Sequence, residues 1–110
     1  MKRTETIKDQ KLFNNIIRNG KFIKNNFFVI YNIRKEEEQI YYGIAISNKV
    51  GNAVTRNKYK RRIRAIIDKK NYQKGINCII ILRKSILDRE YIEIENALLK
   101  AFKDLKITKE

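Results

Sequence analysis

The sequence predicts one α/β domain organised around a parallel strand–helix–strand unit. Residues 40–47 alternate between two faces as a strand does, and residues 76–82 form a continuous apolar run that is typical of a strand buried on both faces. Between them, residues 52–70 carry apolar side chains at helical spacing. A strand, a long helix and a second strand form a parallel βαβ unit. The 110 residues suffice for one domain with a modest core.

The N-terminal third predicts a helix followed by a strand. Residues 9–19 have apolar side chains at helical spacing, and Gly20 fits the left-handed position that ends a helix. Residues 27–33 alternate as a strand, with Tyr31 on the face opposite Phe28. The Tyr31 hydroxyl needs water or a polar partner, so this ring is expected to be exposed.

Local signals also mark where the two later helices begin. Gly51 supplies a permissive backbone and Asn52 a plausible cap for the central helix. Residues 88–105 read as the last helix, which Asp88 can cap. The buried stripe of the central helix is expected to contain Tyr59, Ile63, Ile66 and Ile67.

One face of the second strand carries only small side chains beyond Tyr41. Gly43, Ala45 and Ser47 share that face and leave room above the sheet. Close packing of a helix and an open ligand groove both explain such a face. The sequence leaves these two readings open.

Positive charge concentrates in one segment. The net charge is +14, and residues 48–64 hold seven of the 26 lysines and arginines. No Asp or Glu occurs between positions 39 and 67, so i,i+4 neighbours such as Arg56 and Lys60 repel each other. This positive charge is expected to bind an external polyanion, and nucleic-acid phosphate is the first candidate.

The sequence lacks residues that several classes of protein need for their function. There is no histidine, and Cys78 is the single cysteine, so neither a zinc ligand set nor a nucleophile–base pair is present. Cys78 lies in an apolar run and is expected in the core. No export signal or membrane span is recognised, and a cytoplasmic protein is expected. The single domain spans 1–110, with 1–8 and 106–110 expected as flexible tails.

A sixteen-residue block carries a family resemblance. Residues 49–64 read K-V-G-N-A-V-T-R-N-K-Y-K-R-R-I-R. This block resembles the signature of the bacterial ribonuclease P protein subunit, which reads roughly K-x-G-x-A-V-x-R-N-x-x-K-R-x-x-R. The resemblance extends over most of the chain, apart from 1–8 and 106–110. It implies a two-layer α+β fold similar to ribosomal protein S5 domain 2. Such a fold has three helices and about four mostly antiparallel strands, with a left-handed βαβ crossover.

The resemblance also implies the function. The expected partners are the catalytic RNA subunit of ribonuclease P and precursor tRNA, whose single-stranded 5′ leader the protein holds during tRNA 5′ maturation. The protein is then a subunit of an endoribonuclease that supplies no catalytic residue. Mg²⁺, bound mainly by the RNA components, is the expected cofactor. No obligate protein partner and no membrane association are expected.

The resemblance implies the site residues by position, and charge adds the neighbouring cations of the basic helix. Contacts with the RNA subunit are expected from Lys49, Arg56, Asn57, Lys58, Lys60, Arg61, Arg62 and Arg64. Contacts with the leader are expected from Phe13, Ile17, Tyr31, Arg56, Asn57 and Lys60. Three positions depart from the family pattern. Lys58 replaces a common Arg, Asn48 a common Lys, and Ile17 a common aromatic.

Two other functions compete with this one. A ribosomal or general RNA-binding protein of the same fold would take part in no reaction, because fold alone does not determine function. A transcription factor would read DNA with the helix that contains Arg56 and Arg64. The chain lacks a short helix and tight turn directly before that helix, which argues against helix-turn-helix docking.

Overall fold

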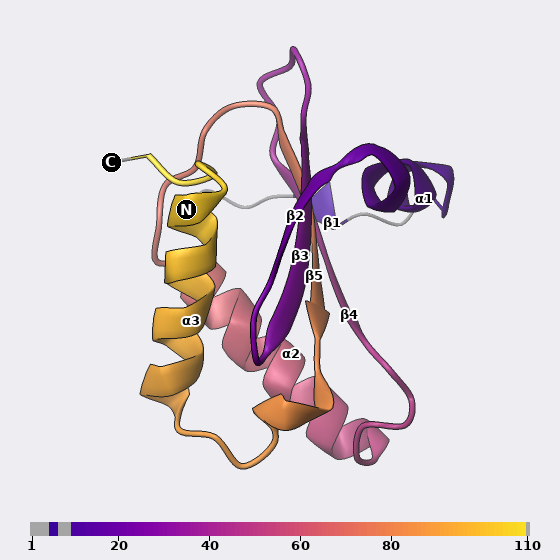
Figure 1. The fold of residues 1–110 in the computed structure, drawn as a ribbon, viewed down its shortest axis with the longest axis vertical. Coiled ribbons are helices and arrows are strands. Elements are labelled where there is room, and N and C mark those ends of the chain that lie inside the picture. Colours follow the sequence, from indigo (N-terminus) through magenta and orange to yellow (C-terminus); the bar gives the residue numbers. More distant parts are fainter. Residues whose placement is uncertain (1–4, 7–9, 110) are drawn as a thin grey trace.

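The computed structural model describes residues 5–6 and 10–109 (Figure 1). The elements, in chain order, are β1 (Glu5–Thr6), α1 (Gln10–Asn19), β2 (Lys21–Lys24), β3 (Phe28–Arg34), β4 (Tyr41–Ile46), α2 (Ala53–Ile67), β5 (Ile76–Leu82), the 3-10 helix η1 (Lys84–Ile86) and α3 (Tyr91–Asp104). The three expected α-helices and three expected strands are therefore confirmed.

The strands form one mixed sheet in the order β1-β4-β5-β3-β2. β4 and β5 are parallel neighbours joined by α2, which confirms the predicted βαβ unit. β3 runs antiparallel to both β5 and β2, whereas β1 runs parallel to β4. The four longer strands match the expected number, and two of the three pairings between them are antiparallel, as expected. The handedness of the crossover stays a prediction.

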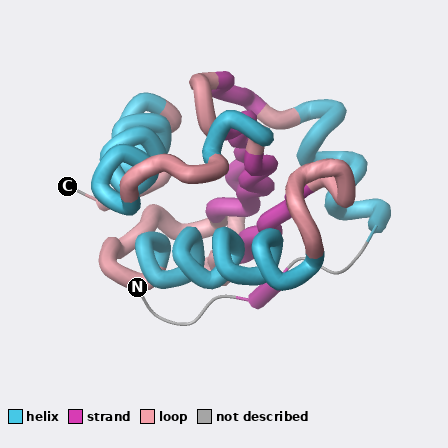
Figure 2. The backbone as a smooth tube through the Cα atoms, turned by 90° about the horizontal axis from the view of Figure 1, so that it is seen from below, coloured by secondary structure: helices cyan, strands magenta, loops and turns pink. Residues whose placement is uncertain are grey.

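Helices cover the two faces of the sheet unequally. In both views the strands lie between α3 and α1 (Figures 1 and 2). α2 and α3 share the main core with one sheet face, where Phe28, Ile30 and Ile80 are fully buried. α1 packs on the opposite face through Ile16, which is also fully buried. The small-residue face of β4 belongs to this second, thinner layer.

Local chemistry explains the limits of α2. The Asn52 side chain accepts a hydrogen bond from the Thr55 backbone N–H at 2.9 Å, and Gly51 has φ 61°, so both expectations are confirmed. The predicted stripe of Tyr59 and three isoleucines is buried. The helix ends at Ile67 rather than 70, because the chain turns there to place Tyr72 in the core. The Tyr72 hydroxyl donates to the Ile67 carbonyl at 2.7 Å and satisfies a helix-terminal acceptor.

Two capping predictions were wrong. Glu90, not Asp88, is the N-cap residue of α3, and it makes no side-chain cap bond. Asp88 instead has φ 62°, and its backbone N–H donates to the Tyr59 hydroxyl at 2.8 Å. Gly20 does not have a positive φ. It is needed for space, since a Cβ there would lie 2.5 Å from the Ile16 carbonyl oxygen.

The expected tails are partly structured. Ile107 is fully buried, and Thr108 forms a β-bridge with Tyr72, so residues 106–109 belong to the fold and the tail prediction was wrong there. Glu5–Thr6 pairs with β4. The rest of 1–8, together with Asp9 and Glu110, lies outside the described residues. β2 was not predicted, because four residues at an edge give too short a pattern.

Candidate nucleic-acid interface

The turn before α2 is held by the first arginine of the basic helix. Arg56 Nη1 donates to the Gly51 carbonyl at 2.9 Å and to the Asn48 carbonyl at 3.0 Å. Asn48 lies two residues after β4, so these bonds join the chain just beyond the strand to the first turn of the helix. The Arg56 side chain is thereby partly covered, and it lies at the end of the sheet instead of in the core.

The rest of the basic helix faces solvent. Lys58, Arg61 and Arg64 are exposed, as are Lys49 and Asn57, whereas Lys60 and Arg62 are half-buried. The three ion pairs between described residues are Lys69–Glu95, Lys74–Glu38 and Lys100–Asp104, and none involves residues 49–64. The positive charge of this segment therefore stays available to an external anion.

The predicted contact residues divide between two flanks of α2. Arg62 stacks over the Tyr59 ring with 5.3 Å between its Cζ and the ring centroid, and Tyr59 bonds to the loop before α3. Arg62 therefore lies on the flank next to α3. Arg56 bonds to the turn after β4, and at 100° per residue Lys60 and Arg64 follow it on the opposite flank. The motif residues Arg56, Lys60 and Arg64 thus share the flank near β4.

The second predicted group lies between α1 and the sheet. Phe13 and Ile17 are four residues apart on α1 and are half-buried beside Ile16. Tyr31 lies on β3, on the sheet face that α1 covers. The structure therefore places these three residues in one layer, on the sheet face opposite α2 and α3.

One strip of this sheet face connects the two groups. Tyr31 pairs with Ile79, which pairs with Gly43, and the next row contains Val29, Ile81 and Ala45. The residues of this second row are half-buried rather than fully covered. β4 then runs on toward Asn48, where Arg56 is attached. The second row thus leads from beside Tyr31 to the basic flank of α2. An extended strand of RNA could follow it.

Phe22 is an aromatic neighbour of Tyr31 that was not among the expected site residues. Phe22 lies on β2 with 60% of its surface exposed, and its ring centroid is 5.6 Å from that of Tyr31. The two residues are cross-strand partners. Tyr31 itself is only half-buried, and Phe22 provides part of its cover. Phe22 was missed because β2 was not predicted, and the pairing of β2 with β3 is what places Phe22 beside Tyr31.

No group of three or more His, Cys, Asp or Glu side chains within 5–6 and 10–109 could hold a metal ion. Cys78 is buried as expected, and burial raises the pKa of its thiol to about 12. No described helix is long and apolar enough to cross a membrane. What the described residues offer is an arrangement of cations and aromatic rings that suits binding.

These features define a small, basic α+β protein that presents a helix rich in lysine and arginine beside a half-open sheet face. The family model of ribonuclease P matches residues 1–106, including the N-terminal residues outside the expected resemblance. The chain belongs to the ribonuclease P protein family, and it is thus a subunit of an endoribonuclease.

Curated relatives and solved structures agree with this assignment. The ribonuclease P protein component of Mycoplasma capricolum is 41% identical over 109 residues, covering 96% of this chain and all of that protein. The component from Streptococcus gordonii is 36% identical and covers 100% of this chain and 93% of its own. The Staphylococcus aureus RNase P protein structure has a TM-score of 0.85 at 32% identity, covering 97% of this chain and 100% of that one. The Thermotoga maritima protein has a TM-score of 0.81 at 25% identity, covering 91% and 96%.

Proposed function

We propose that this protein binds the catalytic RNA subunit of ribonuclease P and the 5′ leader of precursor tRNA, and so promotes removal of the leader. The observation that carries the proposal is the uncompensated basic face of α2 beside the sheet strip that leads to Tyr31. RNA phosphates neutralise such a face by releasing counterions. Bases of a single strand can stack on aromatic rings at a sheet surface.

The proposed roles differ along the site. Lys49, Lys58, Arg61, Arg62 and Arg64 bind phosphates of the RNA subunit. Arg56, Asn57 and Lys60 lie where the two RNAs meet, because their flank of α2 adjoins the end of β4. Phe13, Ile17 and Tyr31 hold the leader. Ile17 supplies an apolar contact there, without the stacking that an aromatic residue would add.

The chemistry is assigned to RNA and Mg²⁺. The described side chains provide no carboxylate cluster for a divalent ion. The protein instead lowers phosphate repulsion between the two RNAs, which raises the apparent Mg²⁺ affinity of their complex. We place the reaction in the cytoplasm.

The deciding experiment measures precursor tRNA cleavage by the matching RNA subunit at low Mg²⁺, with and without this protein. The protein should restore cleavage at the mature 5′ end. Binding of the RNA without any change in cleavage would support a general RNA-binding protein instead. The affinity for the RNA subunit should also fall by about 10³-fold or more between 50 and 200 mM salt, as expected when about six or more phosphates are neutralised.

A further inference from the structure

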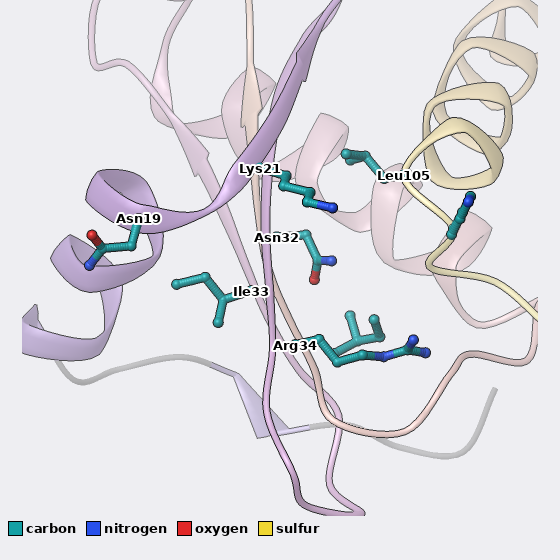
Figure 3. A pocket seen from close by; sticks show the side chains of 8 residues that line it. Asn19, Lys21, Asn32, Ile33, Arg34 and Leu105 are labelled. Carbon is teal, nitrogen blue, oxygen red and sulfur yellow. The ribbon is translucent and has the colours of Figure 1, made fainter.

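A basic cavity lies away from the basic surface of α2. It has a volume of about 330 Å³ and lies between the β2–β3 pair and the C-terminal end of α3 (Figure 3). This end of α3 is opposite the turn that starts α2 (Figure 1). The lining residues are Asn19, Lys21, Asn32, Ile33, Arg34, Ile76, Leu105 and Lys106.

The strand register brings polar side chains to this position. Lys21 and Asn32 are cross-strand partners, and Arg34 lies two residues further along the same face of β3. Toward the other end of β3, this face carries Phe28 and Ile30 under the main core. Figure 3 shows Lys21, Asn32 and Arg34 all extending toward the side where Leu105 lies. The polar part of the face thus begins where α3 ends.

Asn32 leaves a hydrogen-bond acceptor unused. Its Oδ1 atom is buried and has no hydrogen-bond partner among the described residues. Leaving a buried acceptor unpaired is unfavourable, and native proteins retain few of them. Asn32 lines the cavity, so a turn of its amide would bring this oxygen to an N–H donor of a bound molecule.

The charge at the cavity has one sign. Lys21, Arg34 and Lys106 contribute three positive charges, and no Asp or Glu lines the cavity. Arg34 Nε donates to the Lys74 carbonyl at 3.3 Å, which holds its side chain without neutralising it. Like charges gathered around one space favour an anionic ligand.

The backbone of Lys106 has a conformation that is unusual for lysine. Lys106 has φ 58°, a left-handed conformation that glycine or asparagine usually adopts after a helix. Its N–H donates to the Lys103 carbonyl at 3.0 Å, and the Ile107 N–H donates to Phe102 at 2.9 Å. This pattern ends the helix and would be formed at less strain by glycine. A lysine there suggests that its side chain has a role beyond the fold.

We infer that this cavity binds one unpaired nucleotide of the ribonuclease P RNA, with its phosphate at Lys21, Arg34 and Lys106 and an amino group of its base at Asn32 Oδ1. The inference rests on the proposed function and extends it to a second RNA contact. The apolar side chains of Ile76 and Leu105 provide contact for the base. A backbone phosphodiester alone would leave Oδ1 unpaired, because it carries no O–H or N–H donor. Adenine, cytosine and guanine each carry the required amino group.

Two substitutions test the site without endangering the fold. Lys106→Gly removes one charge and suits the left-handed backbone, so stability should be kept or increased. Asn32→Leu removes the unpaired acceptor at similar volume, so folding should again be retained. Lys103→Ala is the matched control, because Lys103 lies three residues earlier and lines a different cavity, with Lys70, Lys100 and Thr108.

The measurement is the affinity of each variant for the RNA subunit across a salt series, with thermal unfolding recorded alongside. Lys106→Gly should weaken binding several-fold and reduce the salt slope by about one. Asn32→Leu should weaken binding without changing the slope, and Lys103→Ala should have a smaller effect than either.

Two results would overturn the inference. If Lys106→Gly and Lys103→Ala weaken binding equally, the cavity contributes only diffuse charge. If Asn32→Leu binds as well as the wild type, the cavity holds no base. Both failures are distinguishable from failure of the proposed function, since the wild-type protein would still restore precursor tRNA cleavage.

Discussion

Arg56 donates through Nη1 to the carbonyl oxygen of Gly51 at 2.9 Å, so the first arginine of the basic helix also holds the turn that begins it. A second bond from the same nitrogen reaches Asn48. Gly51 has φ 61° in this turn. Arg56 therefore couples the fold of the turn to the RNA contact that we propose for it.

Substitution of Arg56 should reveal both roles. Arg56→Ala removes two hydrogen bonds to backbone carbonyls, so we expect a loss of about 1 kcal/mol in the free energy of unfolding, together with weaker RNA binding. Arg61→Ala is the control, because Arg61 is exposed and its side chain forms no hydrogen bond with another described residue. It should weaken RNA binding with stability unchanged. Denaturant unfolding and RNA titration measure the two effects, and equal stability of both variants would contradict the coupling.

Tyr31 should discriminate precursor from mature tRNA. Tyr31→Ala removes the ring from the sheet face that α1 covers, and we expect a loss of about 1–3 kcal/mol in leader binding, the usual range for stacking. Affinity for precursor tRNA should therefore fall much more than affinity for mature tRNA in the assembled enzyme.

Tyr31→Phe provides the control for this prediction. It keeps the ring and its 5.6 Å contact with Phe22, so precursor binding should stay close to that of the wild type. Equal losses of precursor and mature tRNA affinity in Tyr31→Ala would argue against leader contact.

Two glycines with the same backbone conformation should respond differently to alanine. Gly51 and Gly75 have φ values of 61° and 73°. A Cβ at Gly51 would meet only the Thr55 side chain, at 3.1 Å, whereas one at Gly75 would lie 1.9 Å from the Lys35 carbonyl oxygen. Gly51→Ala should destabilise the protein by about 1 kcal/mol from backbone strain. Gly75→Ala adds a backbone clash and should destabilise it considerably more.

Thermal or denaturant unfolding of these two variants decides the point. Similar losses in both would show that the loop around Lys35 can move away from Gly75.

Cys78 should be unreactive in the folded protein. Burial raises the pKa of its thiol from 9.0 to about 12, so almost no thiolate forms at pH 8. Thiol reagents should modify it slowly in the native state and rapidly in denaturant. The unfolded thiol ionises at lower pH than the folded one, so its contribution to stability is complete below pH 9 and is lost as the pH rises toward about 12. Cys78→Ala should remove this pH dependence, and fast native labelling at pH 8 would contradict the burial.

The sequence predicted the basic helix better than it predicted the edges of the fold. The basic helix was evident because residues 49–64 contain many cations and no acid, a property that needs no neighbours to recognise. β2 and β1 were missed because two to four residues have no readable period. Asp88 looked like a cap because caps are recognised by residue type, but Tyr59 accepts its N–H from 29 positions away.

By itself, the sequence determined the parallel βαβ unit, the buried stripe of α2 and the surplus of positive charge, since periodicity and charge are local properties of the chain. Only the tertiary structure decided that Ile107 is core and that the short strand β1 adds a parallel pair beside β4. It alone brought Asn32, Lys21 and Lys106 around one cavity. Strand register and the end of a distant helix made that arrangement, and contacts between segments so far apart leave no pattern in neighbouring residues.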